Sequence, residues 1–238
     1  MRQRLAPLGL AILVLLAAPA SARSFDFLPG AEGFDAKIYD EGREIATEAG
    51  SHPVELEIDL NFESSGAFPE DDLRDLSIEL PPGLIENPLA VPRCSQERFH
   101  LPRSSPFEES LSGEDCFDRT QVGIVEVRSS YGGGETRTFG LFNLAPAPGA
   151  PSAIGFNPYG DPIVLIPRVR QAEGEYGLTL EARNVSQLVG IQGLTLTIWG
   201  TPWSILHNDQ RGDCLNALEP DFGWSKCSIG RPAANPAT

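Results

Sequence analysis

The sequence predicts an all-β protein built as an antiparallel β-sandwich, of either the immunoglobulin-like or the jelly-roll type. Short segments alternate apolar and polar residues, as strands with one buried face do. Gly, Pro and Asp gather between these segments, and no stretch has the apolar spacing of a long amphipathic helix. Eight or nine strands are therefore expected between Phe34 and Trp199, in an order that the pattern does not give.

The clearest strand follows Pro53. Apolar side chains occupy every second position from Val54 to Phe62, so they share one face, which we expect to be buried. A helix would scatter the intervening polar residues around its whole circumference, which is why the run indicates a strand. Those polar residues are expected to face water: Glu55, Glu57, Asp59 and Asn61.

The same reasoning gives the other strands in chain order. The strand 34–39 turns toward a weakly specified partner at 44–47, which would make a small first hairpin. Pro81 and Pro82 end the strand 76–80, because proline cannot donate to a ladder, and Pro167 indicates a bulge or an edge position. The expected strands are 34–39, 54–62, 76–80, 121–127, 136–144, 153–156, 163–170, 176–184 and 194–199.

The first 22 residues have the features of a signal peptide. Arg2 and Arg4 precede an apolar run, Leu8 to Ala18, that is short for a membrane span, and the small residues 20–22 fit a cleavage site after Ala22. An uncleaved membrane anchor is the alternative. No later run is apolar for long enough to cross a bilayer. The mature protein is thus expected outside the cell, either released or held at the cell surface.

The rest of the chain divides by composition into a core domain and two flanks. The expected organisation is a signal peptide at 1–22, a flexible N-terminus at 23–33, a β-sandwich at 34–200 and an irregular disulfide-containing segment at 201–238 with a disordered tail. Loss of Arg2 and Arg4 takes the formal charge from −15 to −17. Such an acidic surface repels nucleic acid and anionic lipid, so neither is an expected partner.

Four cysteines in an exported chain favour disulfides: Cys94, Cys116, Cys214 and Cys227. Three pairings are possible, and the local ones, Cys94–Cys116 and Cys214–Cys227, are preferred because each closes a loop with little apolar periodicity. Each bridge would contribute roughly 3 kcal/mol in the loop-entropy model. A zinc site is the alternative, but the close C-x-x-C pairs that zinc sites usually have are missing from the sequence. No metal or cofactor is expected.

The residues that could carry chemistry are few and scattered. Trp203 and Trp224 are candidates for a carbohydrate-contacting surface, whereas Trp199, at the end of a strand, is expected to pack in the core. A hydrolytic site around His207 and Asp209 is a further alternative, since triads assemble in space rather than in sequence. The sequence has no Gly-x-Ser-x-Gly or His-Glu-x-x-His motif, so we expect no enzyme.

Several turn-rich runs along the mature chain resemble one group of proteins. These runs are 80–88, Cys94, Cys116, 121–123, 176–179, 184–187 and 196–202. They are similar to landmarks of uncharacterised large secreted β-rich surface or extracellular proteins of high-GC bacteria. The resemblance covers most of the mature chain and implies a multidomain surface protein, of which this chain would be a shortened member or a fragment. Its motifs are structural turns, so it implies no catalytic residue.

The sequence therefore predicts an exported, non-enzymatic β-sandwich module with a structural or adhesive role at the bacterial cell surface or outside the cell. A carbohydrate-binding module is the first alternative and a secreted hydrolase the second. Other surface proteins or glycans are the partners that such a role would take.

Overall fold

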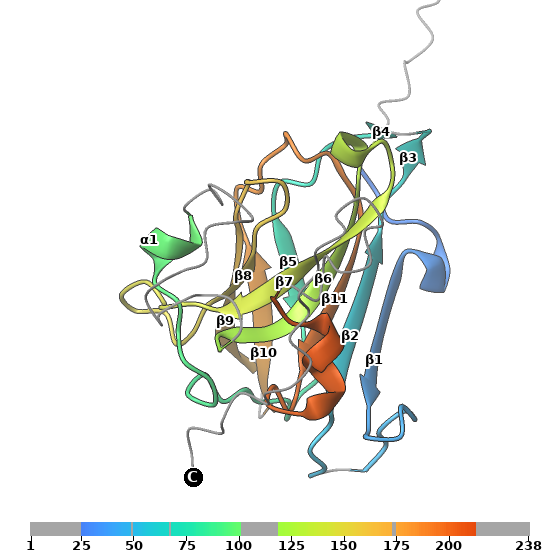
Figure 1. Ribbon diagram of the computed structural model, residues 1–238. Coiled ribbons are helices and arrows are strands. Elements are labelled where there is room, and N and C mark those ends of the chain that lie inside the picture. The colour runs from blue at the N-terminus through green and yellow to red at the C-terminus, as the bar shows by residue number, and fades with distance from the viewer. Residues whose placement is uncertain (1–24, 49, 67, 101–118, 173–174, 213–238) are drawn as a thin grey trace, which may run out of the picture.

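The computed structural model describes residues 25–48, 50–66, 68–100, 119–172 and 175–212 (Figure 1). Strands dominate these residues, and the helices among them are short, with three to six residues each. The strands are β1 (Phe34–Tyr39), β2 (Glu55–Asn61), β3 (Ser64–Ser65), β4 (Phe68–Pro69), β5 (Leu76–Glu79), β6 (Gln121–Ser129), β7 (Thr136–Asn143), β8 (Ile154–Phe156), β9 (Ile163–Ala172), β10 (Glu175–Ala182) and β11 (Ile191–Trp199). The helices are α1 (Gln96–Phe99) and the 3-10 turns η1 (Gly30–Glu32), η2 (Ser130–Gly132) and η3 (Ile205–Gln210).

Nine of these strands form one antiparallel sheet, in the order β1-β2-β11-β6-β7-β8-β9-β10-β5. The prediction of an antiparallel β protein is therefore confirmed, and each of the nine expected strands coincides with a strand of this sheet. The division into the two separate sheets of a sandwich is not confirmed, because the hydrogen-bonded order is continuous from β1 to β5. β3 and β4 form a small separate hairpin.

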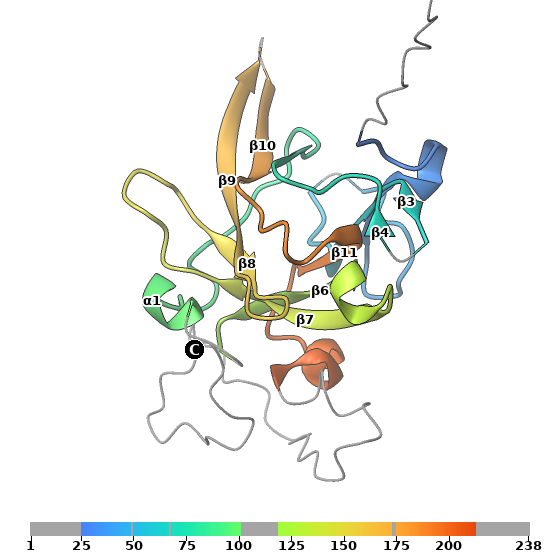
Figure 2. The same ribbon diagram turned by 90° about the horizontal axis from the view of Figure 1, so that it is seen from above.

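The sheet curls at β8, its shortest member. β8 pairs with β7 at two positions and with β9 at three, so β7 and β9 are held together only over this length. Beyond it the two halves diverge, and β9 and β10 turn away from β6 and β7 (Figure 2). Pro167 pairs with Leu180 of β10 but lies past the last β8 partner, Leu165. Among the described strands, Pro167 thus has a partner on the β10 side alone, and the predicted bulge or edge at this residue stays a prediction.

The core lies inside the curl and receives side chains from both halves of the sheet. The alternating face of β2 is buried as predicted, with Ile58, Leu60 and Phe62 at most 2% exposed. These side chains pack with residues from β6 and β11 on one half and from β8, β9 and β10 on the other. The interior contains a cavity of about 20 Å³, room for about one water molecule.

The polar face of β2 departs from the prediction. Glu55 was expected to face water, yet it is 7% exposed, and Glu57, Asp59 and Asn61 are half-buried. Asp59 accepts a hydrogen bond from the Thr195 hydroxyl at 2.7 Å. The outer face of β2 is therefore partly covered, at Glu55 by the segment that follows β11.

Several short segments differ from the prediction. The expected partner at 44–47 makes only a bridge between Tyr39 and Ile45, and β1 pairs with β2 instead. In the N-terminal segment that was expected to be flexible, Phe25 and Phe27 pack on Phe62, with ring centroids 4.7 and 5.2 Å away. The turns α1 and η3 were not predicted. Each begins with a serine, Ser95 or Ser204, whose hydroxyl accepts a backbone N–H.

The loop before α1 is held down by Asn143, at the end of β7. The side-chain amide of Asn143 is 3% exposed and donates to the carbonyl oxygens of Val91, at 3.0 Å, and Pro88, at 3.2 Å. Backbone hydrogen bonds from Cys94 to Asn143 and from Ala145 to Cys94 add to it. No helix in the part of the chain that the structure describes is long and apolar enough to cross a membrane.

Candidate functional site

The short 3-10 helix η3 lies against the strands β2 and β11 (Figure 1), and a group of chemistry-bearing side chains that includes His207 and Trp199 lies between them. The Ser204 hydroxyl accepts the Leu206 N–H at 3.3 Å, which starts the 3-10 turn and turns His207 inward. The His207 ring is fully buried and stacks on Trp199, with centroids 4.4 Å apart and planes 8° from parallel. The Arg211 guanidinium lies 4.8 Å from the centroid of the same indole. We call this group the His207 cluster.

Gln121, the first residue of β6, anchors the far end of the cluster. Its side-chain amide donates to the carbonyl oxygen of Gln210 at 2.8 Å, and its oxygen accepts the Gly212 N–H at 3.1 Å. Gln121 is itself fully buried, so these bonds replace water that it cannot reach. The segment after β11, which was expected to be aperiodic, is thus fixed to the sheet as far as Gly212.

The electrostatics keep His207 neutral. Burial, followed by the charge of Arg211, lowers the pKa of His207 from 6.5 to about 4, and Asp209 opposes this only in part. The nearest carboxylate oxygen, on Glu55, lies 3.7 Å from Nδ1, beyond a hydrogen bond. The other oxygen of Glu55 already accepts a hydrogen bond from Arg43 at 3.0 Å.

The His207 cluster lacks the geometry of a hydrolytic site within the described residues. Neither ring nitrogen of His207 has a hydrogen-bond partner there, so no hydroxyl is placed to give up a proton to it. Asp209, the expected acid, is exposed and is not hydrogen-bonded to the imidazole. The arrangement instead provides a flat apolar contact between His207 and Trp199 that closes the outer face of the sheet.

The tryptophans occupy different surroundings. Trp199 is 2% exposed and packs as predicted. Trp203 is half-buried, and its indole N–H donates to the carbonyl oxygen of Ala90 at 2.9 Å, which ties the segment after β11 to the loop before α1. Trp224 lies outside the described residues. The proposed contact surface of Trp203 and Trp224 therefore stays a prediction.

Of the four cysteines, Cys94 lies within the described residues, where it is 3% exposed. Cys116, Cys214 and Cys227 lie outside them, so the pairing stays a prediction. Over the described ranges, no three side chains of His, Cys, Asp or Glu come together as metal ligands.

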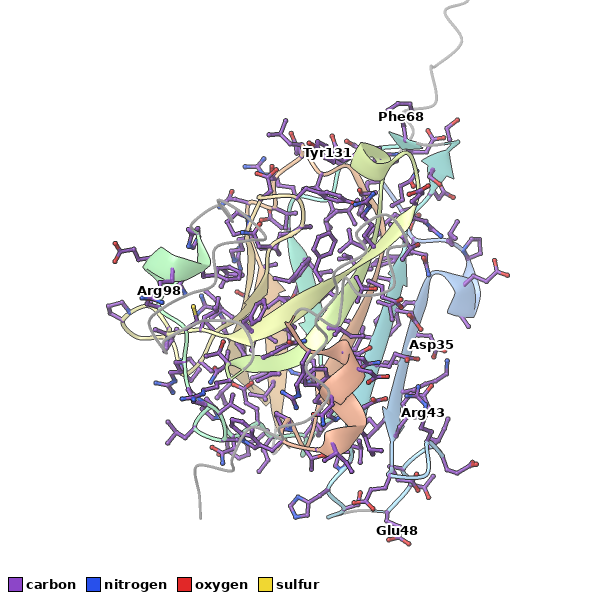
Figure 3. The ribbon with its side chains drawn as sticks, in the orientation of Figure 1. Asp35, Arg43, Glu48, Phe68, Arg98 and Tyr131 are labelled. Atoms are coloured by element: carbon purple, nitrogen blue, oxygen red, sulfur yellow. The ribbon has the colours of Figure 1, made fainter. Side chains whose placement is uncertain are left out.

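A second feature is an exposed apolar end of the molecule, formed by Phe68, Tyr131 and Leu188, which are 67%, 69% and 77% exposed. Figure 3 shows Phe68 and Tyr131 at the same end of the sheet. The loop of Leu188 joins them through a hydrogen bond from the Ser130 N–H to the carbonyl oxygen of Gly190, at 2.9 Å. The Tyr131 ring also lies on Tyr159, with centroids 4.8 Å apart. We call these three residues the apolar end.

No protein-family model matches the chain, and neither a curated protein nor a solved structure matches it.

Proposed function

We propose that the protein is an exported, non-enzymatic β module with a structural or adhesive role at the bacterial cell surface or outside the cell. In this proposal the curled sheet serves as a sandwich-like scaffold of immunoglobulin or jelly-roll type. The leader at 1–22 supports export. The resemblance to large secreted surface proteins of high-GC bacteria supports the same assignment.

The observation that carries the adhesive role is the apolar end. Large apolar side chains from β4, from η2 and from the loop before β11 lie at this end and stay open to solvent. Hydrogen bonds between the loops, such as that from Gln192 to the Gly66 carbonyl oxygen at 3.2 Å, hold the end in shape. A preformed apolar surface of this kind suits contact with another envelope component, because little order is lost on binding.

Cell fractionation tests the proposal. The full chain, produced in a high-GC bacterial host, is compared with the triple variant Phe68→Ser, Tyr131→Ser, Leu188→Ser. The matched control replaces Ile85, Leu89 and Ile205, which are 87%, 76% and 69% exposed elsewhere, by Ser. We expect the wild type and the control to stay with the cell surface and the first variant to appear in the medium. Equal retention of all three would contradict the adhesive role of the apolar end. Unprocessed protein inside the cell would contradict export.

A carbohydrate-binding module is the second candidate, and Tyr131 favours it. Its exposed ring is backed by Tyr159, as a platform for the flat face of a sugar requires. Glycan-array binding that is lost on Tyr131→Ala, and kept on Trp203→Ala, would support this candidate at the apolar end. Loss on Trp203→Ala alone would return the site to the tryptophans.

A further inference from the structure

A groove of about 280 Å³ lies on the outer face of β9 and β10, away from both the His207 cluster and the apolar end. Its floor comes from β9, where Ile163, Leu165 and Pro167 point into the core and the alternate residues point outward. Val164 and Ile166 are the outward apolar residues and are half-buried. Arg168, Glu181, Arg183 and, from the end of α1, His100 supply the polar lining.

One carboxylate holds the two arginines of the groove in place. Oε2 of Glu181 accepts a hydrogen bond from Nε of Arg168 at 2.8 Å, and from Nη2 and Nε of Arg183 at 3.2 and 3.3 Å. Arg168, followed by Arg183, lowers the pKa of Glu181, so this carboxylate is charged at neutral pH. Within the described residues, both Nη groups of Arg168 and Nη1 of Arg183 are left out of the contact with Glu181. These three donor groups remain for a ligand.

The charge of the groove runs against that of the chain. The protein carries a formal charge of −15, yet two guanidiniums meet a single carboxylate here, which leaves a positive excess beside an apolar floor. The His100 ring lies beside this pair, with its Nδ1 2.6 Å from the Gln96 carbonyl oxygen, to which it donates. The acidic surroundings disfavour a long anionic polymer by repulsion but affect a small anion much less.

We propose that this groove binds a small organic carboxylate, with its apolar body on Val164 and Ile166 and its carboxylate held by Arg168 and Arg183. A guanidinium fork matches a planar carboxylate in two parallel hydrogen bonds, and Glu181 preorganises the pair. Among the described residues that line the groove, His100 alone has an aromatic ring, so they form no platform for a sugar face. The site is independent of the role proposed for the apolar end.

Isothermal titration calorimetry on the mature chain tests the site with four probes. Cyclohexanecarboxylate has both required parts, cyclohexanecarboxamide has the same shape without the charge, glucuronate has a polar body, and inorganic phosphate has no body. We expect saturable binding of cyclohexanecarboxylate and at least about tenfold weaker binding of the other three. The carboxamide loses hydrogen bonds to a charged group, which are worth about a factor of ten, and glucuronate and phosphate lose the apolar contact. No saturation by about 10 mM, or equal binding of the carboxamide, overturns the proposal. Equal binding of phosphate makes the groove a general anion site and overturns it as well.

Variants locate the binding. Arg183→Ala and Arg168→Ala should each weaken cyclohexanecarboxylate by about tenfold, while Arg168→Lys, which keeps the charge but loses the pair of Nη donors, should weaken it less. Arg137→Ala, an exposed arginine on β7, is the control and should bind as the wild type. The melting temperature of each variant without ligand shows whether it is folded. Ile166→Ser provides a second line, because it should weaken cyclohexanecarboxylate without changing glucuronate. Unchanged binding in folded Arg183→Ala contradicts the assignment.

Discussion

His207→Phe tests whether the buried imidazole makes the stability of the protein depend on pH. Phenylalanine keeps a flat ring against Trp199, where the imidazole now lies 4.4 Å away and nearly parallel. It removes the titrating group together with two ring nitrogens that have no hydrogen-bond partner among the described residues. The substitution should therefore preserve the packing on the outer face of β11 and remove the protonation equilibrium of His207.

The sign of the effect follows from the lowered pKa of His207. As pH falls below 6.5 the unfolded chain takes up a proton, whereas the folded protein resists it down to a pKa of about 4. The contribution to the free energy of unfolding is therefore fully present above pH 6.5 and is lost progressively toward pH 4. At about 1.4 kcal/mol per pKa unit, the loss over this range is about 3 kcal/mol.

Urea unfolding at several pH values between 4 and 7 measures the effect. Carboxylates titrate in the lower part of the range, so the useful quantity is the difference in free energy of unfolding between wild type and variant at each pH. We expect this difference to move by about 3 kcal/mol in favour of His207→Phe as pH falls. His52→Gln, at an exposed histidine, should show a flat difference. A flat difference for His207→Phe, or one that favours the wild type at low pH through an ion pair with Glu55, would refute the reasoning.

Three further predictions concern the scaffold. Gly123→Ala would place a Cβ atom 2.1 Å from the Thr197 carbonyl oxygen, so we expect urea unfolding to show a loss of about 3 kcal/mol. Gly42→Ala, whose Cβ atom would meet only the Asp40 carboxylate, at 3.3 Å, should lose much less, and equal losses would contradict the contact. Asn143→Ala should cost about 1–3 kcal/mol and speed amide hydrogen exchange at residues 89–91, whereas unchanged exchange would show that the Asn143 amide does not hold that loop. Non-reducing peptide mapping of the secreted chain should yield the pairs Cys94–Cys116 and Cys214–Cys227, and free thiols or crossed pairs would be evidence against them.

Local alternation was enough to locate the strands, because the two faces of a strand are decided within a few residues. The order of the strands depends on distant partners. β11 is inserted between β2 and β6, where Thr195 meets Asp59, 136 residues earlier in the chain, and nothing in either segment specifies that pairing. The curl could not be predicted either, since it results from the shortness of β8, which pairs at two positions on one side and three on the other.

The His207 cluster escaped sequence reasoning for a different reason. The pattern of β2 assigns Glu55 to a wet face, and the pattern is right about which face it lies on. Whether that face is exposed to water depends on the segment after Trp199. This segment contains the short 3-10 helix η3 and has no periodicity to detect. The one local signal was Ser204, a capping residue before Ile205.

The segment from Ile163 to Pro167 shows how a misfit between pattern and burial can point to a site. Its apolar residues occupy both faces, which predicted a strand with an edge or a bulge at Pro167. The structure gives one face to the core and leaves Val164 and Ile166 half-buried on the other, where Val164 also packs against the small cluster of Phe99 and Phe142. Ile166 belongs to neither hydrophobic cluster, so its apolar surface stays available, beside Val164, for a ligand to cover. Two ordered guanidiniums beside them favour a ligand that carries negative charge. The outer face of β9 therefore indicates a ligand site, whereas its inner face indicates only the fold.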